Sequence, residues 1–303
     1  MSILIFKYPK LPNHTFRIIL LLIYSLTACQ KEETSQAVIK DEPIFIGDFE
    51  TGDTSQWGDV NRNLKRPLSD QLEIVTSPVR EGIYAAKTTV HNGDEFLNTG
   101  GERCDFERDI AIPFEKEGAD LWYAWSTLFP SGWQKLPIIP EENWLLIADW
   151  HSTYDDIGQL LQLEIDSDNY IWARGLTGKV NGYNGFQGNG DANYIEQKFP
   201  QRMIPGEWND FVIHVKWTTK KEGLITIWHK TESQVQFTRV LQLNKIPTLQ
   251  YLTTANNYKA PYFILAHYRT SANTHTSVIY HDGFRIGKTK EAVQVGDLYM
   301  IKE

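Results

Sequence analysis

Residues 211–228 read FVIHVKWTTKKEGLITIW, two short runs of alternating apolar and polar side chains separated by a polar stretch that ends in Gly223. A period of two is typical of a β-strand with one buried face, because successive side chains point to opposite faces of a sheet. The polar stretch between the runs is typical of a turn. Residues 211–217 and 224–228 are therefore predicted to be two strands joined by a turn.

The same pattern recurs along the chain. Alternating runs occupy residues 72–75, 122–126 and 161–165, bounded by glycine, proline, asparagine or aspartate, and no segment shows a long helical period. Many strands without helices between them favour two packed antiparallel sheets. We therefore predict an all-β chain folded as a β-jelly-roll sandwich, the concanavalin A-like architecture.

The N-terminal segment is typical of an exported bacterial protein. It carries only positive charges, then an apolar run over 18–24 that is too short to span a bilayer, then Leu-Thr-Ala-Cys at 26–29. The last stretch resembles a lipobox, in which Cys29 becomes lipidated; the alternative is an ordinary secretory signal with an incidental cysteine. Residues 30–33 resemble a surface-export tag.

These features predict three parts of the chain. Residues 1–28 are a lipoprotein signal peptide, residues 29–42 are the lipidated cysteine and a flexible tether, and residues 43–303 are the jelly-roll domain. The predicted location is the bacterial outer membrane or cell surface. Contact with the membrane is expected only through the lipid.

Net charge and cysteine count limit the ligands and the sources of stability. The formal charge is −8, and removal of residues 1–28 would leave −11, since that segment holds three basic and no acidic residues. Such a protein does not bind nucleic acid through bulk charge, so an anionic ligand requires a locally basic cleft. Cys104 is the only cysteine besides Cys29, so no intramolecular disulfide is expected. We expect a monomer.

A glycine- and asparagine-rich stretch from Gly175 to Asn193 interrupts the strand pattern. A loop of that length in a compact domain is usually a lid or a binding loop. A disordered surface insertion is the alternative.

Several stretches, taken in order, resemble the heparin lyase I and glucuronan lyase group of polysaccharide lyases, whose shared fold is a β-jelly roll. They are DFETGD (48–53) with Trp57, VTSPVREG (75–82), GGERCD (100–105), WYAWS (122–126), DWH (149–151), GEWNDF (206–211), HYR (267–269) and YHDG (280–283). Their order and spacing carry the resemblance, which spans nearly the whole domain. It implies β-elimination at a uronic acid of an acidic polysaccharide.

Such an elimination needs a cation that neutralises the uronate, a base that removes the proton beside it, and an acid that protonates the departing oxygen. The resemblance assigns the base and acid roles to His151 and Tyr268, and the carboxylate contact to Arg103. Imidazole accepts a proton near neutral pH, and a guanidinium matches a carboxylate. Further predicted substrate contacts are Asp149, Trp150 and Arg269.

Purely structural roles are the alternatives for the same residues. The DWH stretch could be an alternating strand with a buried Trp150, and Tyr268 could be a core tyrosine. Arg103 could form a structural ion pair with a neighbouring acid. Alternation sends Tyr268 and Arg269 to opposite faces. The family often has an amide where this chain has Asp149, which could orient His151 but would repel a uronate.

Other residues are candidates for supporting roles. Arg174, Lys179, Lys198 and Lys259 could extend a basic cleft. Glu50 and Asp282 come from the first and last strands, which in jelly-roll carbohydrate proteins lie side by side and frequently hold a structural calcium ion. Oxygen ligands suit Ca²⁺, so Glu50 and Asp282 are predicted calcium ligands that Asp48 and Asp53 could assist. Solvated strand-end acids are the alternative.

Two further functions are alternatives to the lyase. Residues 164–168 (EIDSD) resemble the catalytic strand of laminarinase-type glycosidases, with Glu164 and Asp166 on one face. The final glutamate of that motif is missing, so a hairpin turn is the better interpretation. The third function is a non-catalytic glycan-binding lipoprotein that holds sugar with Trp125, Trp133 and Trp150. A large separation between His151 and Tyr268 would favour this third function.

Overall fold

The alternating runs form strands, as predicted. The run over 211–217 lies mostly in β11 (Trp208–Lys216) and the run over 224–228 in β12 (Gly223–Thr231), and the two pair antiparallel with Val215 opposite Ile225. This computed structural model describes residues 41–96, 101–109, 111, 113–139, 142–153, 159–180 and 192–301, which belong to one unit, residues 40–303. The predicted signal peptide, Cys29 and most of the tether lie outside the described residues.

One sheet is named here the β6 sheet. It has eight strands in the order β13 (Thr238–Ile246), β12, β11, β6 (Asp120–Leu128), β17 (Ser277–Gly287), β4 (Ala85–Val90) and β3 (Leu72–Val75), and β1 (Phe45–Gly47) also pairs with β17. All its pairs are antiparallel.

The other sheet is named the β7 sheet. Its nine strands follow the order β15 (Asn257–Tyr258), β14 (Gln250–Leu252), β9 (Tyr170–Val180), β8 (Leu161–Ile165), β7 (Leu145–His151), β16 (Tyr262–Thr270), β5 (Gly101–Glu107) and β2 (Asp59–Arg62), and β10 (Ala192–Arg202) also pairs with β9. Only β14 and β9 pair in parallel among the described strands. The helical elements described are two 3₁₀ turns, η1 (Leu68–Asp70) and η2 (Glu291–Val293).

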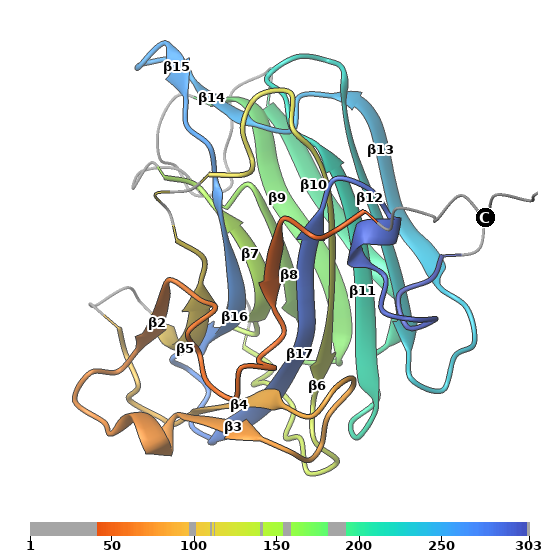
Figure 1. Cartoon of the computed structure of the whole chain (residues 1–303). Helices are drawn as coiled ribbons and strands as arrows, with labels where there is room; N and C mark the ends of the chain where they lie inside the picture. The colour runs from red at the N-terminus through yellow and green to blue at the C-terminus, as the bar shows by residue number, and fades with distance from the viewer. Residues whose placement is uncertain are drawn as a thin grey trace, which may run out of the picture. The chain divides into compact units, whose positions relative to one another are not determined.

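The two sheets pack face to face (Figure 1). An aromatic core lies between them. Trp125 of β6 and Trp150 of β7 have ring centroids 6.4 Å apart, and Phe263 of β16 stacks on Phe284 of β17 at 4.4 Å. All four side chains are fully buried. Each such burial stabilises the fold by about 1.5–3 kcal/mol. The all-β prediction with two largely antiparallel sheets is confirmed.

The structure can be compared with two further expectations from the sequence. The predicted loop from Gly175 to Asn193 is shorter than expected, because β9 continues to Val180 and β10 begins at Ala192. The residues between, 181–191, lie outside the described part. Among the described residues, no helix is long and apolar enough to cross a membrane.

Candidate functional site

The candidate site lies on the outer face of the β7 sheet, the face turned away from the β6 sheet. Because side chains alternate along each strand, the residues between the core positions point outward. Ile147, Leu163, Leu265 and Phe106 are core residues of four adjacent strands. The outward residues on these strands include Asp149 and His151 of β7, Gln162 and Glu164 of β8, Tyr262 and Tyr268 of β16, and Arg103 and Asp105 of β5.

Arg103 and Tyr268 form the centre of this face. They are cross-strand partners of β5 and β16, and the Arg103 guanidinium lies 3.6 Å from the centre of the Tyr268 ring. Trp144 packs edge-on against the same ring, with centroids 5.0 Å apart. Gly101 permits this placement, because a Cβ there would lie 2.3 Å from the Tyr268 ring. Two of the predicted site residues are therefore in direct contact.

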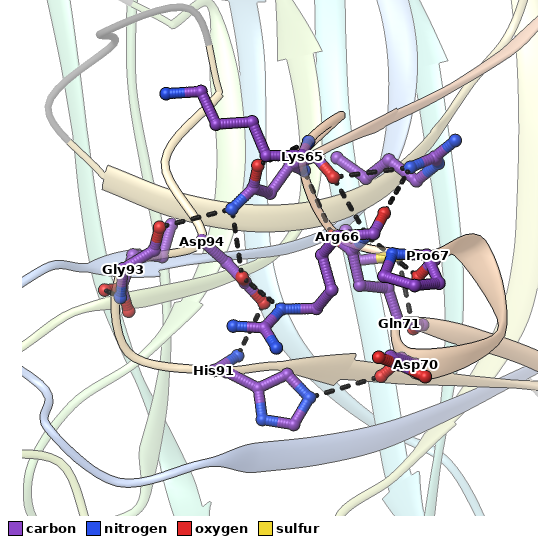
Figure 2. Close-up of polar contacts among 12 residues, drawn as sticks. Lys65, Arg66, Pro67, Asp70, Gln71, His91, Gly93 and Asp94 are labelled. Atoms are coloured by element: carbon purple, nitrogen blue, oxygen red, sulfur yellow. Dashed lines mark hydrogen bonds and ion pairs between the residues drawn. The ribbon is translucent and has the colours of Figure 1, made fainter.

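A polar cluster includes Arg66, Gln71, His91 and Asp94 (Figure 2). The buried Asp94 carboxylate accepts hydrogen bonds from Arg66 Nε at 2.7 Å and from the His91 amide at 2.8 Å. The Asp94 carbonyl accepts the Arg103 amide at 3.1 Å. Gln71 ties the neighbouring loop down through the Arg66 and Pro67 carbonyls. The Arg103 amide is thus bound to Asp94, whose carboxylate is held in turn by Arg66 and the His91 amide.

His151 stands at the end of β7 with a defined tautomer. Its Nδ1 lies 2.7 Å from the Ser152 carbonyl oxygen, which can only accept, so Nδ1 carries the hydrogen in that bond. Nε2 is then the nitrogen with the lone pair in the neutral ring. The ring leans on Tyr262, its cross-strand partner, at 5.3 Å. His151 is half-buried and able to accept a proton at Nε2.

Two buried carboxyl groups lie between these residues. Burial raises the pKa of Asp149 to about 6, although His151 and Arg103 favour its charged form. Burial also raises the pKa of Asp105 to about 7, against the opposing effects of Arg103 and of the hydrogen bond from the His267 amide. Arg103 Nη1 lies 3.7 Å from Asp105. The predicted structural ion pair of Arg103 with a neighbouring acid therefore exists beside its contact with Tyr268.

A cavity of about 410 Å³ opens beside Tyr268. It is lined by Trp144, Leu146, Gln159, Gln162, Glu164, Arg174 and Tyr268. Arg174 Nη1 donates to Glu164 at 2.6 Å, and Gln162 Nε2 donates to the other Glu164 oxygen at 2.7 Å. The volume is within the range of small-ligand sites, and the lining combines aromatic rings with charged and amide groups. Such a lining suits a sugar with an acidic substituent.

A basic and aromatic strip continues from the cavity across β9 and β10. Lys198 lies 3.6 Å from the ring centre of Tyr170 and 5.3 Å from that of Trp172. Arg202 lies over the same Tyr170 ring at 4.9 Å, and Arg174 over Trp172 at 4.8 Å. These three cations, each held over an aromatic ring, give this part of the outer face a local positive charge.

Only part of the predicted basic cleft forms. Arg174 lines the cavity and Lys198 continues it, whereas Lys179 and Lys259 are exposed and are not among the residues that line it. Sequence reasoning missed Trp144, Gln162, Tyr170 and Trp172. The alternation of LQLEI over 161–165 placed Gln162 and Glu164 on one face, but that pattern does not say which face is outer.

His151 and Tyr268 share the outer face but not the same place on it. Tyr262 is opposite His151, and Leu146 is opposite Tyr268, so five or six residues of strand separate the two positions. At about 3.3 Å per residue, roughly 17–20 Å of backbone lies between them. Asp149 lies between these positions along β7, whereas Arg103 is opposite Tyr268 on β5. The structure brings Tyr268 together with Arg103 more closely than with His151.

Trp150 and Arg269 lie in the interior of the protein, which corrects the prediction that they contact the substrate. Trp150 is fully buried in the core, where its ring meets Tyr123 at 5.1 Å. Arg269 is also fully buried and donates to Glu102 at 2.7 Å. Both alternate inward from an outward neighbour, so neither is placed to contact a substrate. Trp125 is likewise a core residue, and Trp133 packs against Phe129 at the core's margin.

Glu50 and Asp282 are both used to hold one segment, residues 80–84. Glu50 accepts the amides of Ile83 and Tyr84 at 2.9 Å, and Asp282 accepts the amide of Arg80 at 2.6 Å. Asp48 pairs with Arg285, and the exposed Asp53 accepts hydrogen bonds from Thr51 and Ser55.

One cation already lies in this region, because the Arg285 guanidinium pairs with Asp48 and with Glu81. In the described chain, no group of three or more His, Cys, Asp or Glu side chains is placed to hold a metal ion. The calcium site stays a prediction.

The two carboxylates of the hydrolase-like motif, Glu164 and Asp166, have different structural roles. Glu164 faces the cavity, but Asp166 closes a turn by accepting the Asp168 and Tyr170 amides at 2.8 and 2.9 Å. Its other oxygen accepts Trp172 Nε1 at 2.7 Å. The hairpin interpretation is therefore confirmed.

Comparisons with known proteins add two kinds of likeness. Residues 49–285 match the family model described as polysaccharide lyase. An endo-β-1,4-glucuronan lyase from the fungus Trichoderma reesei has a similar structure, with a TM-score of 0.60 and 15% identity over 82% of this chain and 96% of that one. A glycoside hydrolase family 131 catalytic domain from Coprinopsis cinerea aligns with a TM-score of 0.50 and 11% identity, covering 84% of this chain and 98% of that one. No curated protein sequence matches the chain. The structural likenesses show a shared jelly-roll fold.

Proposed function

The chain belongs to the polysaccharide lyase family, and from this premise we propose that it cleaves a uronic-acid polysaccharide by β-elimination on the outer face of the β7 sheet. The observation that carries the proposal is the Arg103 guanidinium stacked on Tyr268 at the wall of a cavity of about 410 Å³. A cation, a phenol and room for a sugar are thereby together. The glucuronan lyase with a similar fold makes glucuronan the first polymer to test.

The proposed chemistry divides the reaction among the outward residues. Arg103 neutralises the negative charge of the uronate carboxylate, which makes the proton on the adjacent carbon easier to remove. A base takes that proton, the electron pair forms the new C=C bond, and the glycosidic C–O bond breaks while its oxygen takes a proton. His151 at Nε2 and the Tyr268 hydroxyl are the groups proposed for these proton transfers.

The experiment measures the ultraviolet absorbance of the unsaturated uronyl product. The chain from residue 30 onward is incubated with glucuronan, alginate and heparin-like chains. His151→Ala and Tyr268→Phe should each abolish the rise. Tyr280→Phe is the matched control, because it removes a hydroxyl from a tyrosine of β17 on the other sheet, away from the cavity, and it should retain most of the activity. No rise on any polymer would reject cleavage of these substrates.

Capture of acidic polysaccharide without cleavage is the second candidate function. The observation in its favour is the register that sets roughly 17–20 Å of backbone between His151 and Tyr268. A polymer that binds without an absorbance rise, with binding weakened by Arg103→Ala and unaffected by His151→Ala, would establish capture. The aromatic contacts would then come from Trp144 and Trp172 rather than from the core tryptophans.

We also propose attachment to the outer membrane through a lipid on Cys29, which rests on the sequence pattern of residues 18–29. Labelled fatty acid should be incorporated by the wild-type chain and not by Cys29→Ala. Digestion of whole cells by added protease would test exposure at the surface.

The structural calcium ion at Glu50 and Asp282 is likewise still a proposal. A chelator should then lower the unfolding temperature of the wild type, and Glu50→Gln should remove that effect. Equal unfolding temperatures with and without chelator would reject it.

A further inference from the structure

Asp149 occupies an unusual place for a carboxylate in a site that is proposed to bind uronate. Only 3% of it is exposed, and it stands on β7 between His151 on its own strand and Arg103 on β5. A charged carboxylate at this position would repel the acidic substrate and would cost solvation energy. The protonation state of Asp149 therefore decides whether it opposes or assists binding.

One carboxylate oxygen of Asp149 has no hydrogen-bond donor among the described residues, and neither has the side-chain oxygen of the residue opposite. Asp149 Oδ1 is buried and has no partner among the described residues. Gln162 is its cross-strand partner on β8, and its Nε2 is committed to Glu164 at 2.7 Å. Gln162 Oε1 is also buried and has no described partner. Cross-strand partners on one face have Cβ atoms about 4.5–5.5 Å apart, so these two buried acceptors without donors belong to neighbouring side chains.

A protonated Asp149 removes this conflict. A neutral carboxyl group is a donor as well as an acceptor, so it can donate to Gln162 Oε1 when the site is empty. Each buried acceptor that lacks a donor costs about 1–3 kcal/mol. The hydrogen-bond inventory thus favours the neutral acid independently of any titration argument.

The surrounding charges do not overcome this preference. The charged and titratable groups of the outer face near Asp149 are Arg103, Asp105 and Glu107 on β5, His151 on β7, Tyr262 and Tyr268 on β16, Glu164 on β8 and Arg174 on β9. Arg103 and His151 favour the carboxylate, but burial outweighs them and raises the pKa of Asp149 to about 6. Arg174 is paired with Glu164, which limits its effect.

We infer that Asp149 acts as a neutral carboxylic acid that donates its hydrogen to the uronate carboxylate of the bound sugar, beside the Arg103 guanidinium. The inference rests on the proposed uronate-binding function. On binding, the Asp149 O–H group exchanges one acceptor for another, from Gln162 Oε1 to a uronate oxygen. The hydrogen stays covalently bound to Asp149, so no covalent bond forms or breaks. Asp149 is then a specificity-determining residue that accepts an acidic sugar only while it is protonated.

The first test is the pH dependence of binding. Affinity for a glucuronate tetrasaccharide and a mannuronate tetrasaccharide is measured by calorimetry from about pH 5 to about pH 8, the range in which such a proton is lost. Wild-type affinity for the tetrasaccharide that binds should fall by up to about tenfold per pH unit above the transition. Asp149→Asn, whose amide donates at every pH, should bind with nearly constant affinity. Parallel curves for the two proteins would overturn the inference.

Asp282→Asn is the matched control, because Asp282 is a fully buried carboxyl on β17 of the other sheet. It should keep the pH dependence of the wild type. Loss of the dependence in Asp282→Asn but not in Asp149→Asn would overturn the assignment to Asp149. If Asp149→Asn fails to fold, the wild type supplies the answer by infrared spectroscopy. A protonated carboxyl band should shift when the tetrasaccharide binds, and an unchanged spectrum would reject the inference.

The outcomes separate this inference from the proposed cleavage. A wild type that binds a tetrasaccharide in the pH-dependent manner but cleaves no polymer would support the Asp149 inference and reject cleavage. Cleavage with a KM that is the same at every pH would reject the Asp149 inference alone. Failure to bind either tetrasaccharide at any pH would reject the Asp149 inference, and with it the cleavage of glucuronan and alginate.

Discussion

The guanidinium carbon of Arg103 lies 3.6 Å from the centre of the Tyr268 ring, although the two residues are on strands far apart in the sequence. The contact exists because β5 and β16 are neighbours and place the two residues opposite each other. Its planar geometry requires a guanidinium, since an ammonium group offers no flat face to stack on a ring. Arg103 can therefore contact both the phenol and a substrate carboxylate.

Arg103→Lys keeps the charge but should lower kcat/KM by roughly 10- to 100-fold, because the stack and the two-pronged contact with a carboxylate are lost. Steady-state kinetics on the polymer that is cleaved measures this. Arg66→Lys is the control from the polar cluster of Figure 2. It loses the 2.7 Å bond to Asp94 and should lower stability by about 1–3 kcal/mol while kcat changes little. An Arg103→Lys enzyme as active as wild type would contradict the role assigned to the stack.

Lys198→Ala should raise KM about two- to fivefold at low salt and leave kcat unchanged, since it removes one cation from the strip beside the cavity. Added salt should shrink the difference, because screening weakens the attraction that was lost. Lys87→Ala on β4 is the matched control, a lysine paired with Glu73 on the other sheet. Equal effects of the two substitutions would mean that the strip does not contact the polymer.

Arg269→Met should lower the free energy of unfolding by about 3–5 kcal/mol, because it leaves the buried Glu102 carboxylate without its guanidinium. Urea unfolding measures the loss. The double variant Arg269→Met with Glu102→Leu should recover part of it, since no uncompensated buried charge remains. Activity per folded molecule should be unchanged in both. A raised KM with an unaltered free energy of unfolding would instead support the predicted contact of Arg269 with the substrate.

In the presence of chelator, so that no calcium ion is bound, Asp282 should make the protein less stable as the pH rises. Burial raises its pKa to about 8 from an ordinary value of 3.8, so between these values the folded chain binds more protons than the unfolded chain. Stability then falls with rising pH, by at most about 1.4 kcal/mol per pH unit. Asp282→Asn should flatten this slope in urea titrations from about pH 5 to about pH 8, since it removes the titrating proton. Identical slopes in both proteins would exclude Asp282 as the source.

Alternation in the sequence was sufficient to predict strands, their approximate extents and the pairs of residues that share a face. Asp149 with His151 and Arg103 with Asp105 are such pairs, and the opposite directions of Tyr268 and Arg269 follow from the same rule. The rule is local, because each peptide reverses the side-chain direction of the one before it. The all-β class could therefore be inferred without any knowledge of which strands meet.

Tertiary structure alone decided which face is the core and which strands are neighbours. Trp150 and His151 are both plausible on either face, and the buried position went to Trp150 because its ring packs against Tyr123 and Phe263 of other strands. Arg269 can be buried only because Glu102 from β5 neutralises it. The register that sets His151 opposite Tyr262, and Tyr268 opposite Leu146, depends on hydrogen bonds between distant segments. Such long-range pairings leave no local pattern in the sequence, so the geometry of the site could come only from the folded chain.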